Sequence, residues 1–112
     1  LHLAALTSDG SVAACGTFFP QTYEGRPAWR LRGMASDPKF RGQGYAAALL
    51  TEALRLLAER GVTTIWCNAR TEALRFYQGF GFTTVGEEFE SAGVPHYVAV
   101  RSLTGSPNGT ST

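Results

Sequence analysis

Lys39-Phe40-Arg41-Gly42-Gln43-Gly44-Tyr45-Ala46 is the stretch that decides how this chain folds. It follows residues 28–36, which are typical of a β-strand, and it leads into residues 44–60, which have helical periodicity. The two glycines allow positive φ angles, and unpaired backbone N–H groups gather where a helix begins. Such a loop is suited to bind an anion such as a pyrophosphate, and Arg41 adds positive charge. The alternative is that the glycines only make a tight turn.

The segments on either side of this loop predict the fold class. Apolar residues recur at helical spacing before Gly61, which stands at the position of a helix C-cap. Asp9-Gly10 predicts a tight hairpin near the start of the chain. We therefore expect an α/β (α+β) fold with a mixed, mostly antiparallel sheet, the long helix on one face and the short helix on the other. The predicted strands are residues 1–6, 12–19, 28–36, 62–67, 82–89 and 96–103, and the predicted helices are residues 44–60 and 71–78, the second with Thr71 as N-cap.

Length and composition favour one soluble domain. The chain has 112 residues, of which 44% are hydrophobic, and we expect a domain over residues 1–103 followed by a disordered polar tail over residues 104–112. The net charge is +1 without a long basic run, which argues against nucleic acid as a partner. No apolar run is long enough to span a membrane, and residues 1–6 lack the basic region, length and cleavage pattern of a signal peptide, so we expect a cytoplasmic protein that does not bind membranes.

The two cysteines and the first residue carry smaller expectations. Cys15 and Cys67 lie in apolar, β-rich stretches without ligands at metal spacing, so we expect two reduced core thiols and no metal site. The chain begins with Leu1 rather than Met, so we expect part of the natural N-terminus to be missing.

Two other kinds of phosphate loop fit less well. Walker A requires a Gly-Lys-Ser/Thr ending, which the loop lacks. The dinucleotide fingerprint is formally present in Gly42-Gln43-Gly44-Tyr45-Ala46-Ala47, but it expects the glycines directly after a strand. Here residues 37–41 intervene, and the next strand is followed by Asn68-Ala69-Arg70 rather than by an acidic residue. The hairpins around the loop also argue against a repeated βαβ sheet.

Two motifs at compatible spacing resemble those of a known enzyme family. Arg41-Gly42-Gln43-Gly44-Tyr45-Ala46 resembles the signature Arg/Gln-x-x-Gly-x-Gly/Ala of the GCN5-related N-acetyltransferases (GNAT). Ala73-Leu74-Arg75-Phe76-Tyr77-Gln78-Gly79-Phe80-Gly81-Phe82 is similar to the family's Ala-x-x-Phe-Tyr-x-x-x-Gly-Phe. Gly93-Val94-Pro95-His96 resembles a turn of small bacterial members. The likeness covers residues 3–103, and we expect the strand and two helices with which that family begins to be missing.

The resemblance implies a function and a set of ligand contacts. It implies an acetyl-CoA-dependent N-acetyltransferase that passes an acetyl group to a primary amine of a small molecule or peptide by direct attack. It also makes a homodimer one expected assembly. A non-catalytic CoA-binding or interaction domain of the same fold is the alternative. The implied cofactor-binding residues are Met34, Ala35, Ser36, Arg41, Gly42, Gln43, Gly44, Tyr45, Ala46, Asn68, Arg70 and Tyr77.

The resemblance also points to residues that would move protons. Tyr77 is the implied general acid, because a phenol has a pKa comparable to that of the departing thiol. Its alternative role is that of a packed core aromatic. Glu87, Glu88 and His96 are candidates to accept the amine proton, but adjacent strand residues face opposite ways, so only one glutamate would face the cleft. The alternative role of His96 is to brace the hairpin by hydrogen bonding. Water is an alternative acceptor of the amine proton.

Overall fold

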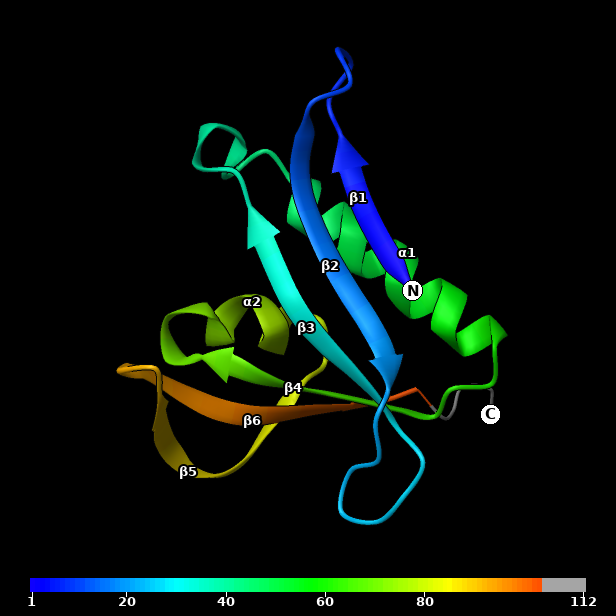
Figure 1. The fold of residues 1–112 in the computed structure, drawn as a ribbon, viewed down its shortest axis with the longest axis vertical. Coiled ribbons are helices and arrows are strands. Elements are labelled where there is room, and N and C mark those ends of the chain that lie inside the picture. The colour runs from blue at the N-terminus through cyan, green and yellow to red at the C-terminus, as the bar shows by residue number, and fades with distance from the viewer. Residues whose placement is uncertain (104–112) are drawn as a thin grey trace.

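The computed structural model describes residues 1–103 and contains one six-stranded sheet with the strand order β1-β2-β3-β4-β6-β5. The predicted element order and the mixed, mostly antiparallel sheet are confirmed (Figure 1). The tail predicted over residues 104–112 lies outside the described residues. The elements are β1 His2–Leu6, β2 Val12–Pro20, β3 Trp29–Ser36, a 3-10 turn Pro38–Phe40, α1 Tyr45–Glu59, β4 Thr64–Arg70, a second 3-10 turn Thr71–Ala73, α2 Leu74–Gly79, β5 Thr83–Ser91 and β6 Val94–Ser102.

Glycines end or join several elements where the backbone needs a positive φ angle. Gly10 has φ 87° between β1 and β2, which confirms the hairpin predicted there. Gly61 has φ 80° just after α1, and the N–H of Val62 reaches back to the carbonyl of Leu57 at 3.0 Å. This is the glycine C-cap that the sequence predicts.

The sheet divides between β3 and β4. These strands are parallel and pair only through Trp29 with Ile65 and Arg30 with Trp66. Beyond these pairs they separate, so that β1-β2-β3 and β4-β6-β5 form the two arms of a V (Figure 1). The parallel connection requires a crossover, which α1 supplies. The open end of the V therefore lies next to the glycine-rich loop between β3 and α1.

A bulge bends β3 along the edge of this opening. The register against β2 shifts between Cys15 and Thr17, and Gly33 has φ 72°, so β3 carries an extra residue there. Simple alternation predicts Met34 on the same face as Arg30, but the extra residue turns Met34 towards the core. A Cβ on Gly16 would lie 3.1 Å from the sulfur of Met34, so the Met34 side chain packs over the backbone of β2 at Gly16.

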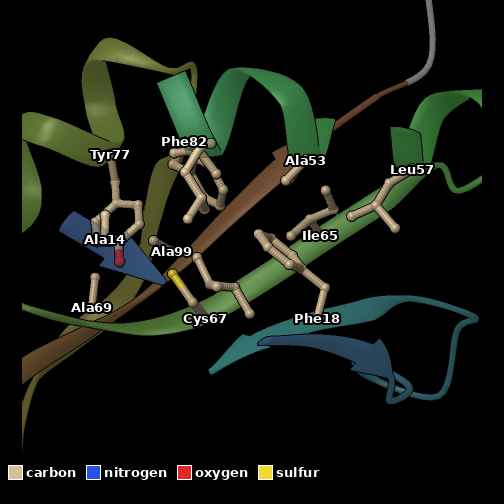
Figure 2. Close-up of a cluster of buried hydrophobic side chains, with 13 residues drawn as sticks. Ala14, Phe18, Ala53, Leu57, Ile65, Cys67, Ala69, Tyr77, Phe82 and Ala99 are labelled. Carbon is tan, nitrogen blue, oxygen red and sulfur yellow. The ribbon is translucent and has the colours of Figure 1, made fainter. Parts of the chain in front are cut away.

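Both helices cover the same face of the sheet, so the prediction of opposite faces is wrong. The crossovers β3-α1-β4 and β4-α2-β5 run in the same direction across the sheet, and such connections are right-handed, which places both helices on one side. Alternate residues of β4 face this side and share one buried cluster with both helices (Figure 2). The cluster includes Ile65, Cys67 and Ala69 from β4, Leu50, Ala53 and Leu57 from α1, and Tyr77 from α2.

Two residue-level predictions are also wrong. Cys67 is buried as expected, but Cys15 is exposed, because the alternate residues Ala14 and Phe18 of β2 are the ones that face the core. Thr71 does not cap the short helix: its hydroxyl donates to the carboxylate of Glu88 at 2.7 Å, so it ties the helix start to β5.

Candidate active site

The separation of β3 and β4 opens a cleft of about 750 Å³, which is within the range of small-molecule sites. Residues 30–36 of β3 form one wall and residues 67–70 of β4 form the other. The remaining lining residues are Arg41, Ala46, Glu72, Ala73, Phe76, Tyr77 and His96. In the part of the chain that the structure describes, no helix is long and apolar enough to cross a membrane. No group of three or more His, Cys, Asp or Glu residues within 1–103 is placed to bind a metal ion.

The start of α1 forms an anion cradle at the open end of the cleft. Gly42 and Gly44 have φ angles of 79° and 84°, and a Cβ at either position would meet no atom within 4 Å. Within residues 1–103, the N–H groups of Gly42, Gly44, Tyr45, Ala46 and Ala47 have no hydrogen-bond partner. Neighbouring N–H groups at a helix start favour a bound anion. The residues present therefore fit the diphosphate of coenzyme A.

The β3 edge that faces the cleft is a second place for polar contacts. Met34, Ala35 and Ser36 line the cleft, and β4 pairs with β3 only at Trp29 and Arg30. The backbone of this edge beyond Arg30 has no neighbouring strand, although backbone N–H and C=O groups need partners. An extended chain that contains amides could pair with it as an added strand does.

Tyr77 lines the cleft from α2. Its ring packs against Phe76 and Phe82, with centroids 5.3 and 5.5 Å away, and the side chain is 8% exposed. Its hydroxyl points towards β4, which carries Cys67 and Ala69 (Figure 2). No residue among 1–103 makes a hydrogen bond to this hydroxyl, yet it is not a fully enclosed unpaired group. Tyr77 is thus both a core aromatic and a lining residue with a free hydroxyl.

Burial controls the protonation of two neighbouring ionisable side chains in the cleft, Tyr77 and Cys67. Burial, and then the neighbouring Cys67, raise the pKa of Tyr77 well above its usual range. Burial raises the pKa of Cys67 to about 12, against a smaller opposite effect of Arg30. Both side chains are therefore protonated at neutral pH, and the thiol is a poor nucleophile.

His96 lines the cleft from β6. Its Nδ1 lies 2.8 Å from the carbonyl oxygen of Val94, and its ring stacks on Phe89 with centroids 5.8 Å apart. Because a carbonyl only accepts hydrogen bonds, Nδ1 carries the proton, and the Nε2 of a neutral ring has a free lone pair. The ring thus braces the hairpin, and its role as a proton acceptor stays a prediction.

Glu87 and Glu88 lie apart from this group. They follow Gly86, which has φ 77°, in a bulge where the pairing of β5 with β6 is interrupted. Both are exposed and neither is among the described residues that line the cleft. Glu88 instead accepts the hydrogen bond from Thr71. Their role as proton acceptors stays a prediction.

The cleft brings together most of the residues that the sequence predicts for cofactor binding. Gly42, Gln43 and Gly44 form an exposed loop beside the cleft rather than its lining, and Tyr45, the first residue of α1, is half-buried and packs edge-on against Phe40. Sequence reasoning missed Arg30 and Arg32, whose alternation on β3 was the available signal. The predicted residues that line the wall are Met34, Ala35, Ser36, Arg41, Ala46, Asn68, Arg70, Tyr77 and His96.

Known proteins are similar to this chain in sequence and fold. Residues 2–98 match the family model described as an acetyltransferase (GNAT) domain. The uncharacterised N-acetyltransferase YitI of Bacillus subtilis is 34% identical over 95 residues, which are 82% of this chain and 64% of that protein. The [ribosomal protein bS18]-alanine N-acetyltransferase of Haemophilus ducreyi is 40% identical over 58 residues, which are 49% of this chain and 40% of that protein.

A solved structure is also similar. The GNAT family N-acetyltransferase YhbS from Escherichia coli, in complex with CoA, has a TM-score of 0.75 and 27% identity over 93% of this chain and 59% of that chain. The chain spans less than two thirds of the length of each of these three relatives.

Proposed function

This chain belongs to the GNAT acetyltransferase family, and we propose that it transfers the acetyl group of acetyl-coenzyme A directly to a primary amine. One observation carries the proposal: a single cleft has an anion cradle at one end and the free hydroxyl of Tyr77 farther in. Acetyl-coenzyme A supplies a thioester whose acyl carbon is open to attack by an amine. The chain's own residues need only bind, orient and move protons.

Two features of the cleft bind different parts of acetyl-coenzyme A: the start of α1 and the unpaired edge of β3. The free N–H groups at the start of α1 and the guanidinium of Arg41 hold the diphosphate. The unpaired edge of β3 at Met34, Ala35 and Ser36 holds the amide-bearing arm in an extended form. The arm therefore leads from the mouth of the cleft towards Tyr77.

Tyr77 donates a proton to the leaving sulfur, and His96 accepts the proton that the amine releases. Burial raises the pKa of Tyr77, so Oη stays protonated throughout the neutral range and is the donor for the leaving sulfur, although it is a weaker acid there than a phenol in water. The Nε2 of His96, with Nδ1 engaged by Val94, is the acceptor in this cleft for a proton released by the amine. Water is the alternative acceptor.

The protonated state of Cys67 argues against an acyl-enzyme on this thiol and favours direct attack by the amine. Cys67 is buried and burial raises its pKa to about 12, so the thiolate needed to take an acyl group is scarce at neutral pH. The amine itself is then the nucleophile. The small-molecule or peptide nature of that amine is open, and the name of the Haemophilus ducreyi relative makes a peptide with an N-terminal alanine one acceptor to include in a screen.

Calorimetric titration of acetyl-coenzyme A into the purified chain tests the binding site. The double variant Arg41→Glu with Gly44→Asp puts negative charge into the cradle, and we expect it to weaken binding by about 100-fold or more. Arg75→Glu with Gly25→Asp is the matched control. Arg75 is exposed outside the cleft lining, and Gly25 has φ 75° with open space around it, so the same charge and backbone changes are made elsewhere.

Three outcomes decide between the candidate functions. Binding that is lost only in the cradle variant supports the site, and release of free thiol on addition of amines then reports turnover. Binding without turnover on any amine supports the alternative, a CoA-binding domain that transfers nothing. A folded chain that binds no acetyl-coenzyme A contradicts both.

A further inference from the structure

The closed end of the cleft holds an arginine that is fixed in place and incompletely paired. Arg30 forms, with Trp66, the last pair before β3 and β4 separate, and it lines the cleft. Its guanidinium carbon lies 4.9 Å from the centre of the Trp66 ring, at a distance typical of a cation–π contact. Its Nη1 donates to the side-chain oxygen of Gln21 over a long 3.4 Å.

The surroundings hold this guanidinium without using all its donors. Trp66 is itself fixed, because its Nε1 donates to the carbonyl of Gln21 at 3.0 Å and its ring packs on Tyr23 at 5.6 Å. Within residues 1–103, the Nε of Arg30 is buried and has no hydrogen-bond partner. Buried donors are normally satisfied, and an arginine has five N–H groups to place. The Nε is closed off from the cleft, but Nη2 also has no partner within residues 1–103 and is not fully buried, so it is the group that is free to receive an acceptor.

The charge around Arg30 is positive and uncompensated. Arg32 lies two residues along β3, on the same strand face and about 7 Å away, and it is exposed. Neither arginine makes an ion pair within the described part of the chain. The cleft has one acidic lining residue among residues 1–103, Glu72, and it lies 3.6 Å from Arg70. The closed end therefore attracts an anion.

This end is separate from the diphosphate cradle. From Arg30 to Ser36, β3 spans about 20 Å along the cleft, and Arg41 and the start of α1 lie beyond Ser36. Tyr77 opens into the cleft from the opposite wall, on α2. A ligand other than the cofactor would thus occupy the Arg30 end while its reactive group points towards Tyr77.

We infer that the acceptor is an amine that carries a carboxylate, which Arg30 and Arg32 bind. The inference rests on the proposed acetyl transfer, and it adds the class of substrate. A carboxylate matches the planar fork of an arginine and accepts two hydrogen bonds from it, which is stronger than a bond to a neutral group. Arg30 then decides specificity, and it touches the acceptor rather than the departing sulfur.

A binding test does not depend on turnover. The Nε–H resonance of Arg30, assigned by its loss in Arg30→Lys, is followed by NMR in the chain saturated with coenzyme A. We expect it to shift on addition of 6-aminohexanoate or shorter ω-amino acids and not with the corresponding ω-amino amides. The inference is overturned if the resonance moves with neither series or equally with both.

Kinetics give the second test. We expect kcat/KM to favour the carboxylates over their amides by about 10- to 100-fold, through KM rather than kcat. Arg30→Met should bring that ratio close to one, and Arg30→Lys should restore part of it. Arg75→Met, an exposed arginine outside the cleft lining, is the matched control and should keep the ratio.

Each failure has its own signature. If acetyl-coenzyme A does not bind, the proposed function fails. If acetyl-coenzyme A binds and amides are acetylated as well as carboxylates, the function stands and the carboxylate inference falls.

Arg30→Met could lose its fold with the Trp66 contact, so its binding of acetyl-coenzyme A is measured first. If that binding is lost, Arg30→Lys decides. Ala-Glu-Ala amide compared with Ala-Gln-Ala amide then distinguishes a peptide carboxylate from that of a small molecule.

Discussion

At the scale of single residues, burial separates two cysteines that look alike in the sequence. Both lie in apolar β-strands, but Cys15 points out of the sheet and Cys67 points under the helices. Burial raises the pKa of Cys67 to about 12 from an ordinary value of 9.0. The folded chain therefore holds the Cys67 proton more tightly than the unfolded chain does, and this contribution to stability is present below pH 9 and lost as the pH rises towards 12.

Thiol labelling tests this difference. At pH 8 we expect a disulfide reagent to modify one thiol of the native chain quickly and the second only after unfolding. Cys15→Ala should abolish the fast reaction, whereas Cys67→Ala should keep it. Rapid labelling of Cys67 in the folded Cys15→Ala variant would contradict the burial of this thiol.

Tyr77→Phe removes one oxygen and keeps the ring that packs on Phe76 and Phe82. If Oη delivers the proton, we expect kcat to fall by about 100-fold while the affinity for acetyl-coenzyme A changes little. Stopped-flow or steady-state thiol release measures the first quantity, and calorimetry measures the second. Tyr97→Phe makes the same change outside the cleft lining and serves as control. An unchanged kcat would leave Tyr77 as a core aromatic alone.

At the scale of elements, the turn from α2 into β5 depends on a glycine that lies close to the half-buried Arg101 of β6. Gly81 has φ 86°, and a Cβ there would lie 2.8 Å from Nε of Arg101. That nitrogen donates to the carbonyl of Phe80 at 2.7 Å, which closes the end of the helix. A side chain at position 81 would therefore strain the backbone and also displace this bond.

Gly81→Ala should lower the free energy of unfolding by about 1–3 kcal/mol. The matched control is Gly79→Ala, because Gly79 has no positive φ angle and its Cβ would meet no atom within 4 Å. That change should be neutral or stabilise the chain by about 0.5–1 kcal/mol, since alanine favours a helix. Urea unfolding measures both, and an equal loss in the two variants would refute the role of Arg101.

The elements that the sequence predicts well are those that depend on near neighbours. The hairpin at Gly10, the cap at Gly61 and the period of α1 are properties of a few consecutive residues. The sequence ends its fourth strand at Cys67, whereas β4 continues to Arg70 because Arg70 pairs with His96, a residue far along the chain. Such pairings are not local, so their extent could not be predicted from periodicity.

The same limit applies to the site. The cradle and Tyr77 lie in short motifs, so sequence reasoning found them. The Arg30 and Trp66 pair joins residues on either side of α1, and only the folded sheet brings them together. The face that α2 covers also depends on the order of strands, which the sequence does not display. The closed end of the cleft was therefore missed.

At the scale of the whole molecule, the cleft lies across a weak line in the sheet. β3 and β4 share two residue pairs, while each arm is held together by longer antiparallel ladders. The buried cluster under both helices joins the arms on one face. A ligand that pairs with the open edge of β3 would thus form backbone hydrogen bonds that β4 does not form with this part of the strand.

Hydrogen exchange tests this view of the molecule. On binding acetyl-coenzyme A we expect amides at residues 42–47, and those of residues 32–36 that face the cleft, to slow by about 10-fold or more beyond the rest of the chain. Residues of β5, at the far edge of the sheet, provide the internal control. Equal slowing everywhere would mean that binding only stabilises the folded state by mass action. Because global stabilisation affects all the most protected amides alike, only the local excess identifies the β3 edge and the cradle as the contacts.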